Sequence, residues 1–291
     1  MLRSSPRALA GLLLTCLLLA ACHREAVAPG DPVAAVRGLA EALRDNDLVR
    51  YSRLSMPPAL YARLETRWRQ ERALAKPPTD AERRDYAHWI GRLTAPGAEA
   101  NLYRSADPKL KKMEGEIRGQ WPMMQATASI FFKGAIQASD KLSPAEKAHA
   151  SELVATVLAW AQPTLITDRD RARQAIAVTV ATAREIDLPT LDQAKALDMV
   201  PALEKAGVGF KGLKRLGLIY GIDGDAALDG VDITLTDVDG DLATMQVGYP
   251  LLGKTVKFEM TLIRRDGRWY SADAVRSAET RLAQPLVAAV P

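Results

Sequence analysis

The sequence predicts an α+β protein: a mainly helical N-terminal bundle, then a small antiparallel β-meander, then a C-terminal helix. Apolar residues recur at helical spacing from Asp31 to about Leu188, and beyond about Val231 they alternate with polar residues instead. Asp-Gly pairs at 239–240 and 266–267 separate the alternating runs, as hairpin turns do. The change in period therefore marks the passage from helices to sheet.

Each helix of the first region is predicted from a start signal followed by an apolar face. The start signals are Asp31 with Pro32, Pro57 with Pro58, Thr79 with Glu82, Ser143 with Glu146, and Thr167 with Asp170. The apolar faces are Val36, Leu39, Ala40 and Leu43; Leu60, Leu64 and Trp68; Tyr86, Trp89, Ile90 and Leu93; Leu153, Val154, Val157, Leu158 and Ala161; and Ile176, Val180 and Ala183. Residues 122–138 are mostly apolar, and we expect them to form a central helix.

The alternating runs predict strands with one buried and one wet face. The inward positions are Val231, Ile233 and Leu235; Ala243, Met245, Val247 and Tyr249; and Val256, Phe258, Met260 and Leu262. The outward positions are Asp232, Thr234, Thr244, Gln246, Thr255, Lys257 and Glu259. This polar face is either simply hydrated or a docking surface for a partner. A last helix over about 272–282 could cover the buried side.

The first 22 residues have the form of a secretory signal. Arg3 and Arg7 give a positive start, and residues 8–21 form an apolar run that is too short to span a bilayer, which needs about 20 apolar residues. The run ends in Leu19-Ala20-Ala21-Cys22, which resembles the lipobox of bacterial lipoproteins. A plain secretory signal, or an uncleaved anchor, is the alternative.

In that family the signal is cleaved just before the cysteine, whose thiol is joined to diacylglycerol and whose new amino terminus is acylated, as with palmitate. The resemblance implies that residues 1–21 are the signal peptide and that Cys22 is the lipidated first residue. An Asp after that cysteine tends to retain such proteins at the inner membrane. The residue here is His23, so the resemblance implies an outer-membrane anchor with the body facing the periplasm.

The chain beyond the signal divides into three expected parts. Residues 22–30 form a lipidated tether, which reaches at most about 30 Å when extended. Residues 31–222 form the helical region, and residues 223–291 form the antiparallel sheet with its C-terminal helix, packed on the helical region.

Charge and cysteine content exclude several classes of protein. Lys and Arg number 39 against 35 Asp and Glu, and loss of Arg3 and Arg7 with the signal leaves 37 against 35. Such a near balance does not indicate a nucleic-acid binder. Cys16 leaves with the signal and Cys22 is used for the lipid, so the mature body has no thiol, which suits the periplasm. We expect no metal ion and no cofactor.

Two motif matches have simpler interpretations. Residues Gly207 to Gly212 fit the dinucleotide fingerprint, but that motif needs a preceding strand within a βαβ unit, so close helix packing or a loop is expected instead. Residues Asp237 to Asp241 fit the first ligand positions of a calcium loop, but Leu242 and Gly248 occupy the positions of the required Gly and Glu. A hairpin turn is expected there.

Seven aspartates without a basic residue predict an acidic patch over 223–241.

No catalytic constellation is recognisable from the sequence. There is no G-x-S-x-G motif. His88 lies off its apolar stripe, which predicts a surface position, and His149 lies at a polar helix start without a second His nearby. Carboxylates such as Glu152 and Glu185 cannot be paired from sequence, so an acid/base pair is untestable at this level.

The early helices also carry a basic surface. Its members are Arg63, Arg67, Arg69, Arg72, Arg83 and Arg84, with Trp68 among them. Acidic residues are interleaved with these arginines, so the pattern predicts a solvated, paired face rather than a nucleic-acid site.

These observations predict a non-enzymatic lipoprotein, anchored at the periplasmic face of the outer membrane, that binds a protein or an envelope component. An immunity or inhibitor protein against a periplasm-acting toxin is the alternative, and a carboxylate-dependent envelope hydrolase is the third hypothesis. The expected partners are the membrane, through the lipid anchor, and a protein or envelope component, but not nucleic acid.

Overall fold

The protein is described by a computed structural model over residues 27–140 and 142–286. The helices are α2 (Pro32–Arg44), α3 (Leu48–Ser55), α4 (Pro58–Leu74), α5 (Asp80–Thr94), α6 (Ala98–Ala138), α7 (Pro144–Trp160), α8 (Pro163–Thr167), α9 (Arg169–Ile186), α10 (Leu191–Ala196), α11 (Met199–Ile219), α12 (Gly224–Asp229) and α13 (Ala272–Ala283). The strands are β1 (Asp232–Asp239), β2 (Leu242–Leu251), β3 (Lys254–Arg265) and β4 (Arg268–Ser271). The predicted α+β class is confirmed: helices come first, then one small antiparallel sheet, then a C-terminal helix.

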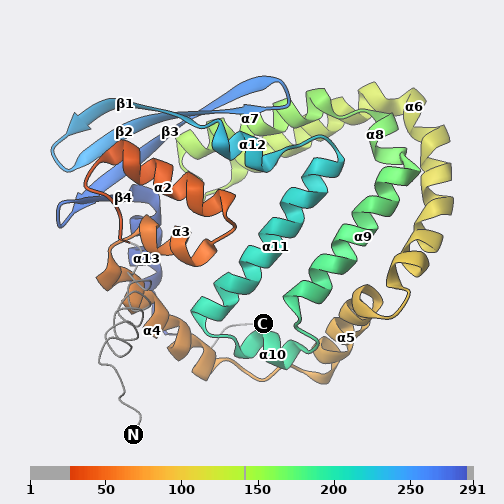
Figure 1. Ribbon diagram of the computed structural model, residues 1–291, viewed down its shortest axis with the longest axis horizontal. Coiled ribbons are helices and arrows are strands. Elements are labelled where there is room, and N and C mark those ends of the chain that lie inside the picture. Colours follow the sequence, from red (N-terminus) through yellow and green to blue (C-terminus); the bar gives the residue numbers. More distant parts are fainter. Residues whose placement is uncertain (1–26, 141, 287–291) are drawn as a thin grey trace, which may run out of the picture.

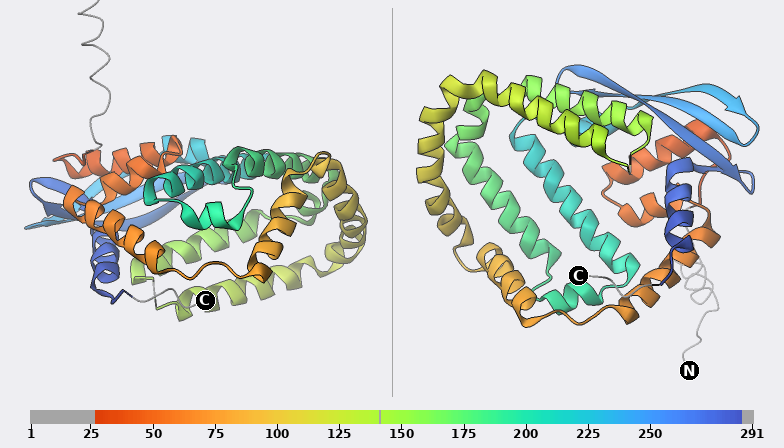
Figure 2. Two further views of the ribbon diagram at one scale, coloured as in Figure 1. Left: turned by 90° about the horizontal axis from the view of Figure 1, so that it is seen from below. Right: turned by 180° about the vertical axis from the view of Figure 1, so that it is seen from behind.

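The helices form a flat body. Helices α4, α5, α6 and α7 follow its edge, while α9 and α11 run side by side through the middle (Figure 1). The edge-on view shows how thin the body is (Figure 2). A thin layer has little interior, and accordingly neither α5 nor α10 contains a buried residue. None of the helices in the described ranges is both long and apolar enough to cross a membrane.

Four of the five predicted helix starts are confirmed, at Asp31, Pro57, Thr79 and Ser143. The Asp31 carboxylate accepts the Ala34 N–H at 2.7 Å, and Thr79 and Ser143 each form a complete capping box. One start was predicted one residue too early. Thr167 ends α8, and it is Asp168 that caps α9 by accepting the Arg171 N–H at 2.9 Å.

The expectation of a central helix over 122–138 was wrong. These residues are the second half of α6, a helix of 41 residues that passes through Pro108 and Pro122 along the edge of the body. Their large apolar side chains lie in solvent, with Ile130 75% and Phe131 68% exposed. Hydrophobicity favours burial only where a partner surface exists, and the thin body offers α6 partners on one side only.

The sheet has the strand order β1-β2-β3-β4 and the register that the alternation predicts. Val247 pairs with Phe258 and Met245 with Met260, so these side chains share the inner face. Lys257 lies on the outer face and is exposed. Leu235 pairs with Met245 on the expected side of the sheet, yet it is 40% exposed rather than buried. A bulge follows Leu235, and Ile233 is the one residue of β1 that is half-buried.

Two hydrophobic clusters hold the sheet to the helices. The first contains Ala35 and Val36 of α2 with Met245, Val247 and other residues of the inner face. Helix α2 therefore covers part of the inner face, and α7 packs on β3, where the His149 ring stacks on Phe258. The C-terminal helix was expected to cover this side, but its buried Val275 and Ala278 belong to the second cluster. A helix from the start of the body and strands from its end thus share one core.

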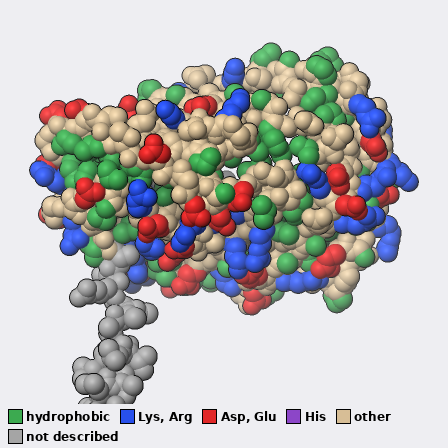
Figure 3. All heavy atoms as spheres, turned by 45° about the horizontal axis from the view of Figure 1, so that its top comes forward, with side chains coloured by type: hydrophobic (Ala, Val, Ile, Leu, Met, Phe, Trp, Pro, Cys, Tyr) green, Lys and Arg blue, Asp and Glu red, His purple; other side chains and the backbone are tan. Residues whose placement is uncertain are grey.

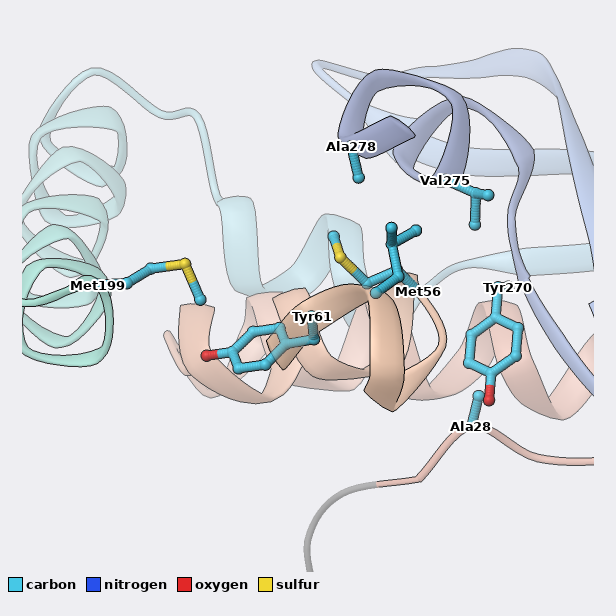
Figure 4. Close-up of a cluster of buried hydrophobic side chains, with 8 residues drawn as sticks. Ala28, Met56, Tyr61, Met199, Tyr270, Val275 and Ala278 are labelled. Carbon is cyan, nitrogen blue, oxygen red and sulfur yellow. The ribbon is translucent and has the colours of Figure 1, made fainter. Parts of the chain in front are cut away.

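The second cluster lies between α4, α13 and strand β4. Its members are Ala28, Met56, Leu60, Tyr61, Met199, Tyr270, Val275 and Ala278. In Figure 4, Met56 lies between Tyr61 and Tyr270, and Ala278 and Val275 of α13 lie above it. The buried residues of both clusters lie between positions 28 and 278. A body that begins at residue 23, directly after Cys22, therefore contains both clusters.

The end of the predicted tether lies against this second cluster. Ala28 is 1% exposed, its carbonyl accepts a hydrogen bond from the Arg268 guanidinium at 2.8 Å, and the Pro29 carbonyl accepts the Trp269 N–H at 3.1 Å. Residues 28–30 therefore belong to the folded body and not to the tether that the sequence predicts. Cys22 and the signal lie outside the described residues.

Candidate ligand-binding cavity over the sheet

A half-enclosed cavity of about 580 Å³ lies over the inner face of the sheet. It is bounded by α2, α7, α12 and the start of α13, with β2 and β3 as its floor. Its apolar lining consists of Val36, Leu39, Ala40, Leu43, Ala145, Ala227, Leu228, Val231, Val247, Phe258, Met260 and Ala274. Its polar lining consists of Tyr51, Glu146, His149, Tyr249, Glu259, Ser271, Asp273 and Ser277. A mostly apolar cavity of this size, with a few polar groups converging on it, has the usual character of a small-molecule site.

Three rings from three elements, α7, β2 and β3, meet at the α7 side of the cavity. His149 Nε2 lies 2.8 Å from the Tyr249 hydroxyl, and the His149 ring stacks on Phe258 with centroids 4.5 Å apart. Tyr249 and Phe258 come from neighbouring strands, and their rings meet edge to face. The stacking fixes the imidazole plane, and the hydrogen bond fixes its rotation.

Burial keeps both members of this pair uncharged. It lowers the pKa of His149 below the ordinary value, against an opposing effect of the Glu152 carboxylate. Burial, with a contribution from the same carboxylate, raises the pKa of Tyr249 to about 12. At neutral pH the phenol and the imidazole are therefore both uncharged, and one hydrogen bond joins the hydroxyl to Nε2.

This arrangement can orient a ligand but is poorly suited to covalent chemistry. A phenol with a pKa of about 12 is a poor acid or nucleophile at neutral pH. Ser271, a half-buried residue that lines the cavity, already accepts the Ala274 N–H as the cap of α13. The His149–Tyr249 pair is best understood as a fixed hydrogen-bonding group in an apolar site.

The other predicted site residues are scattered. His88 is exposed on α5, as expected, and its ring meets that of Trp89 edge to face. Trp89 was expected on the core face of that helix, which is wrong: it is 62% exposed. Glu185 of α9 forms ion pairs with Lys211 and Arg215 of α11, and these pairs join the two helices.

The glycines of the dinucleotide-like motif lie inside α11, and the expected close helix packing is confirmed. A side chain at Gly207 would meet the Asn46 carbonyl oxygen at 2.4 Å, and one at Gly212 would meet Thr182 of α9 at the same distance. Gly209 has no such close neighbour. These glycines let helices approach each other and cradle no phosphate.

The calcium-like run forms the turn of the first hairpin, as expected. Gly240, with a φ of 56°, and Asp241 connect the two strands. Three of the seven aspartates in the expected acidic patch over 223–241 form ion pairs with basic residues from elsewhere in the sequence: Asp225 with Lys214, Asp229 with Arg44, and Asp241 with Arg264. Within the described ranges, no group of three or more His, Cys, Asp or Glu is placed to hold a metal ion.

The arginine-rich early helices are mostly a solvated, paired surface. Figure 3 shows acidic and basic side chains interleaved across one face of the molecule. Arg67 is an exception. It is only 8% exposed and donates to the Gln284 and Pro285 carbonyls, both at 2.9 Å, and to Glu71 at 2.7 Å. This arginine of α4 therefore binds the segment that follows α13.

Sequence reasoning missed the cavity. His149 and Tyr249 are separated by 100 positions, and each has an ordinary local context. The only hint was that His149 flanks an apolar helix face, which does not reveal what that face meets.

Comparisons of the chain with protein-family models, with curated proteins and with solved structures find no match.

Proposed function

We propose that the protein is a lipoprotein, anchored through Cys22 at the periplasmic face of the outer membrane, whose body binds an apolar small molecule. The lipobox-like end of the first 22 residues supports the anchor. The cavity over the sheet supports binding, and it is the single observation that carries this proposal. The envelope component expected from the sequence is then a molecule small enough to enter this cavity.

The interactions of two carboxylates that line the cavity favour binding over catalysis. Asp273 is paired with Arg276 at 3.0 Å, and Glu146 completes the capping box of α7. These two carboxylates thus hold helix-terminal structure as well as lining the cavity, which favours a binding role over that of a carboxylate-dependent hydrolase. No feature of the described residues favours the inhibitor hypothesis.

The anchor is tested by fatty-acid labelling in cells. We expect wild-type protein to incorporate labelled palmitate, and Cys22→Ala to remain unprocessed or become soluble without label. Continued labelling of Cys22→Ala would remove the lipoprotein proposal and leave the cavity proposal standing.

The cavity is tested with an uncharged fluorescent probe, N-phenyl-1-naphthylamine, and the body from residue 23. Ala145 lines the cavity, whereas Ala148, three positions further along α7, is exposed. We expect Ala145→Phe to fill part of the cavity and weaken probe binding by about tenfold or more. Ala148→Phe is the matched control and should bind as wild type does. Equal binding by the two variants would refute the site.

A further inference from the structure

Among the Asp, Glu, Lys and Arg side chains of the protein, those that line the cavity are all acidic. Glu146 and Asp273 line it, and no lysine or arginine does. Glu259 lines it as well, but it neighbours the inward-facing Phe258, so the alternation of the strand turns its side chain to the opposite face. We therefore count two carboxylates at the cavity and no permanent cation.

Four basic residues of the surrounding helices, Arg44, Arg50, Lys147 and Arg276, have other partners. Arg44 pairs with Asp45 and Asp229, and Arg50 pairs with Glu41 and Asp45. Lys147, next to Glu146, donates to the Gln137 carbonyl. Arg276 pairs with Asp273 and reduces its field, but its side chain is 67% exposed and does not line the cavity.

Charge of one sign in a cavity with apolar walls attracts ligands of the other sign, because low-dielectric walls focus the field. An anionic head group would lose hydration and find no cation to replace it, which is costly. An ammonium group would meet carboxylates and the faces of Tyr51, Tyr249 and Phe258, and aromatic faces attract cations.

On the premise of the proposed cavity function, we propose that the natural ligand is a cationic amphiphile: an apolar chain or ring system that carries an ammonium group. The apolar part occupies the floor formed by β2 and β3 beneath α2. The ammonium group lies at the wall formed by α7 and the start of α13, between Glu146 and Asp273.

The test uses three probes with one alkyl chain and different head groups: decylammonium, decanol and decanoate. Each is titrated at neutral pH, below its aggregation concentration, into the body from residue 23, and the heat of binding is measured. We expect decylammonium to bind at least about tenfold more tightly than decanoate, with decanol between them.

Each outcome bears on one proposal. Failure of all three probes, including uncharged decanol, would refute the cavity function itself. Binding of decanol with equal affinities for decanoate and decylammonium would overturn the charge proposal alone. Equally weak binding of both charged probes would also overturn it, because the cavity would then reject charge of either sign.

Two substitutions identify the groups responsible. In Glu146→Gln the capping box is preserved, since Gln serves in that position as Glu does, and Asp273→Asn keeps the shape of the side chain. We expect the double variant to lose most of the preference for decylammonium over decanoate while it binds decanol as before. Glu279→Gln, at an exposed position of α13 away from the cavity, is the matched control and should keep the preference. A double variant that keeps the wild-type preference would overturn the assignment.

Discussion

At the scale of single residues, the molecule uses polar groups chiefly to fix positions. Arg67 holds the chain end, Tyr86 donates to the Leu188 carbonyl at 2.7 Å, and Trp68 donates to the Leu197 carbonyl at 3.0 Å. Each of these side chains reaches a backbone group far away in sequence. Because such groups would cost free energy if buried without partners, they specify which segments meet.

His149 should make the stability of the protein depend on pH. Its pKa is lower in the folded state than the ordinary value of about 6.5. Below that ordinary value the unfolded chain binds more protons than the folded chain, so the free energy of unfolding falls as the pH is lowered. We expect urea midpoints to fall from pH 7.5 to pH 5.5, and to fall less in His149→Gln.

His88→Gln is the control for this measurement, because His88 is exposed. It should reproduce the wild-type difference between the two pH values. A His149→Gln variant with the full wild-type pH dependence would show that another group is responsible.

At the scale of elements, close approach between helices is set by glycine. Helix α11 packs on α9 and on the turn between α2 and α3, where Asn46 adopts a φ of 61°. The Asn46 carbonyl lies so near Gly207 that a methyl group there would overlap it. The distance between α11 and the turn at Asn46 is therefore possible only because residue 207 is a glycine.

Two alanine substitutions in α11 should change stability in opposite directions. Gly207→Ala forces the turn at Asn46 to shift, and we expect a loss of about 1–3 kcal/mol. Gly209→Ala meets only the end of Ile186, at 3.9 Å, so it should gain about 0.5–1 kcal/mol through helix propensity. Urea unfolding of the two variants provides the comparison. Similar changes in both would contradict the packing role of Gly207.

At the scale of the whole molecule, the flat body leaves many apolar side chains in solvent. On α6 these are Met123, Met124, Ile130, Phe131 and Phe132. The two hydrophobic clusters carry most of the burial, and both involve the sheet and the first helices. The stability of the protein should therefore be sensitive to the segment that joins the tether to these clusters.

Removing residues 27–30 tests this sensitivity. A body that begins at residue 31 loses the Pro29 carbonyl, which leaves the N–H of the buried Trp269 without its partner, and loses the Arg268 bond to Ala28. We expect a loss of about 2–3 kcal/mol relative to a body that begins at residue 27. Equal thermal midpoints for the two chains would show that the segment contributes nothing.

Local signals in the sequence determined the class of the fold and most of its elements. A cap such as Asp31 or Thr79 acts on N–H groups three residues away, and the pleat of a strand fixes which face Phe258 and Lys257 take. Both effects are contained in a few consecutive residues, so the sequence reports them directly. The lipobox-like segment is equally local, and the prediction for Cys22 rests on sequence alone.

Only the tertiary structure decided which apolar faces are covered and where a ligand could bind. The large apolar side chains of residues 122–138, and Trp89, have the composition of core segments, yet most of them are exposed because no other element covers that face of their helices. The pairing of His149 with Tyr249, and the alignment of α2 over the sheet, depend on contacts between distant segments. Periodicity shows that a face needs a partner, but the identity of that partner follows from the packing of the whole chain.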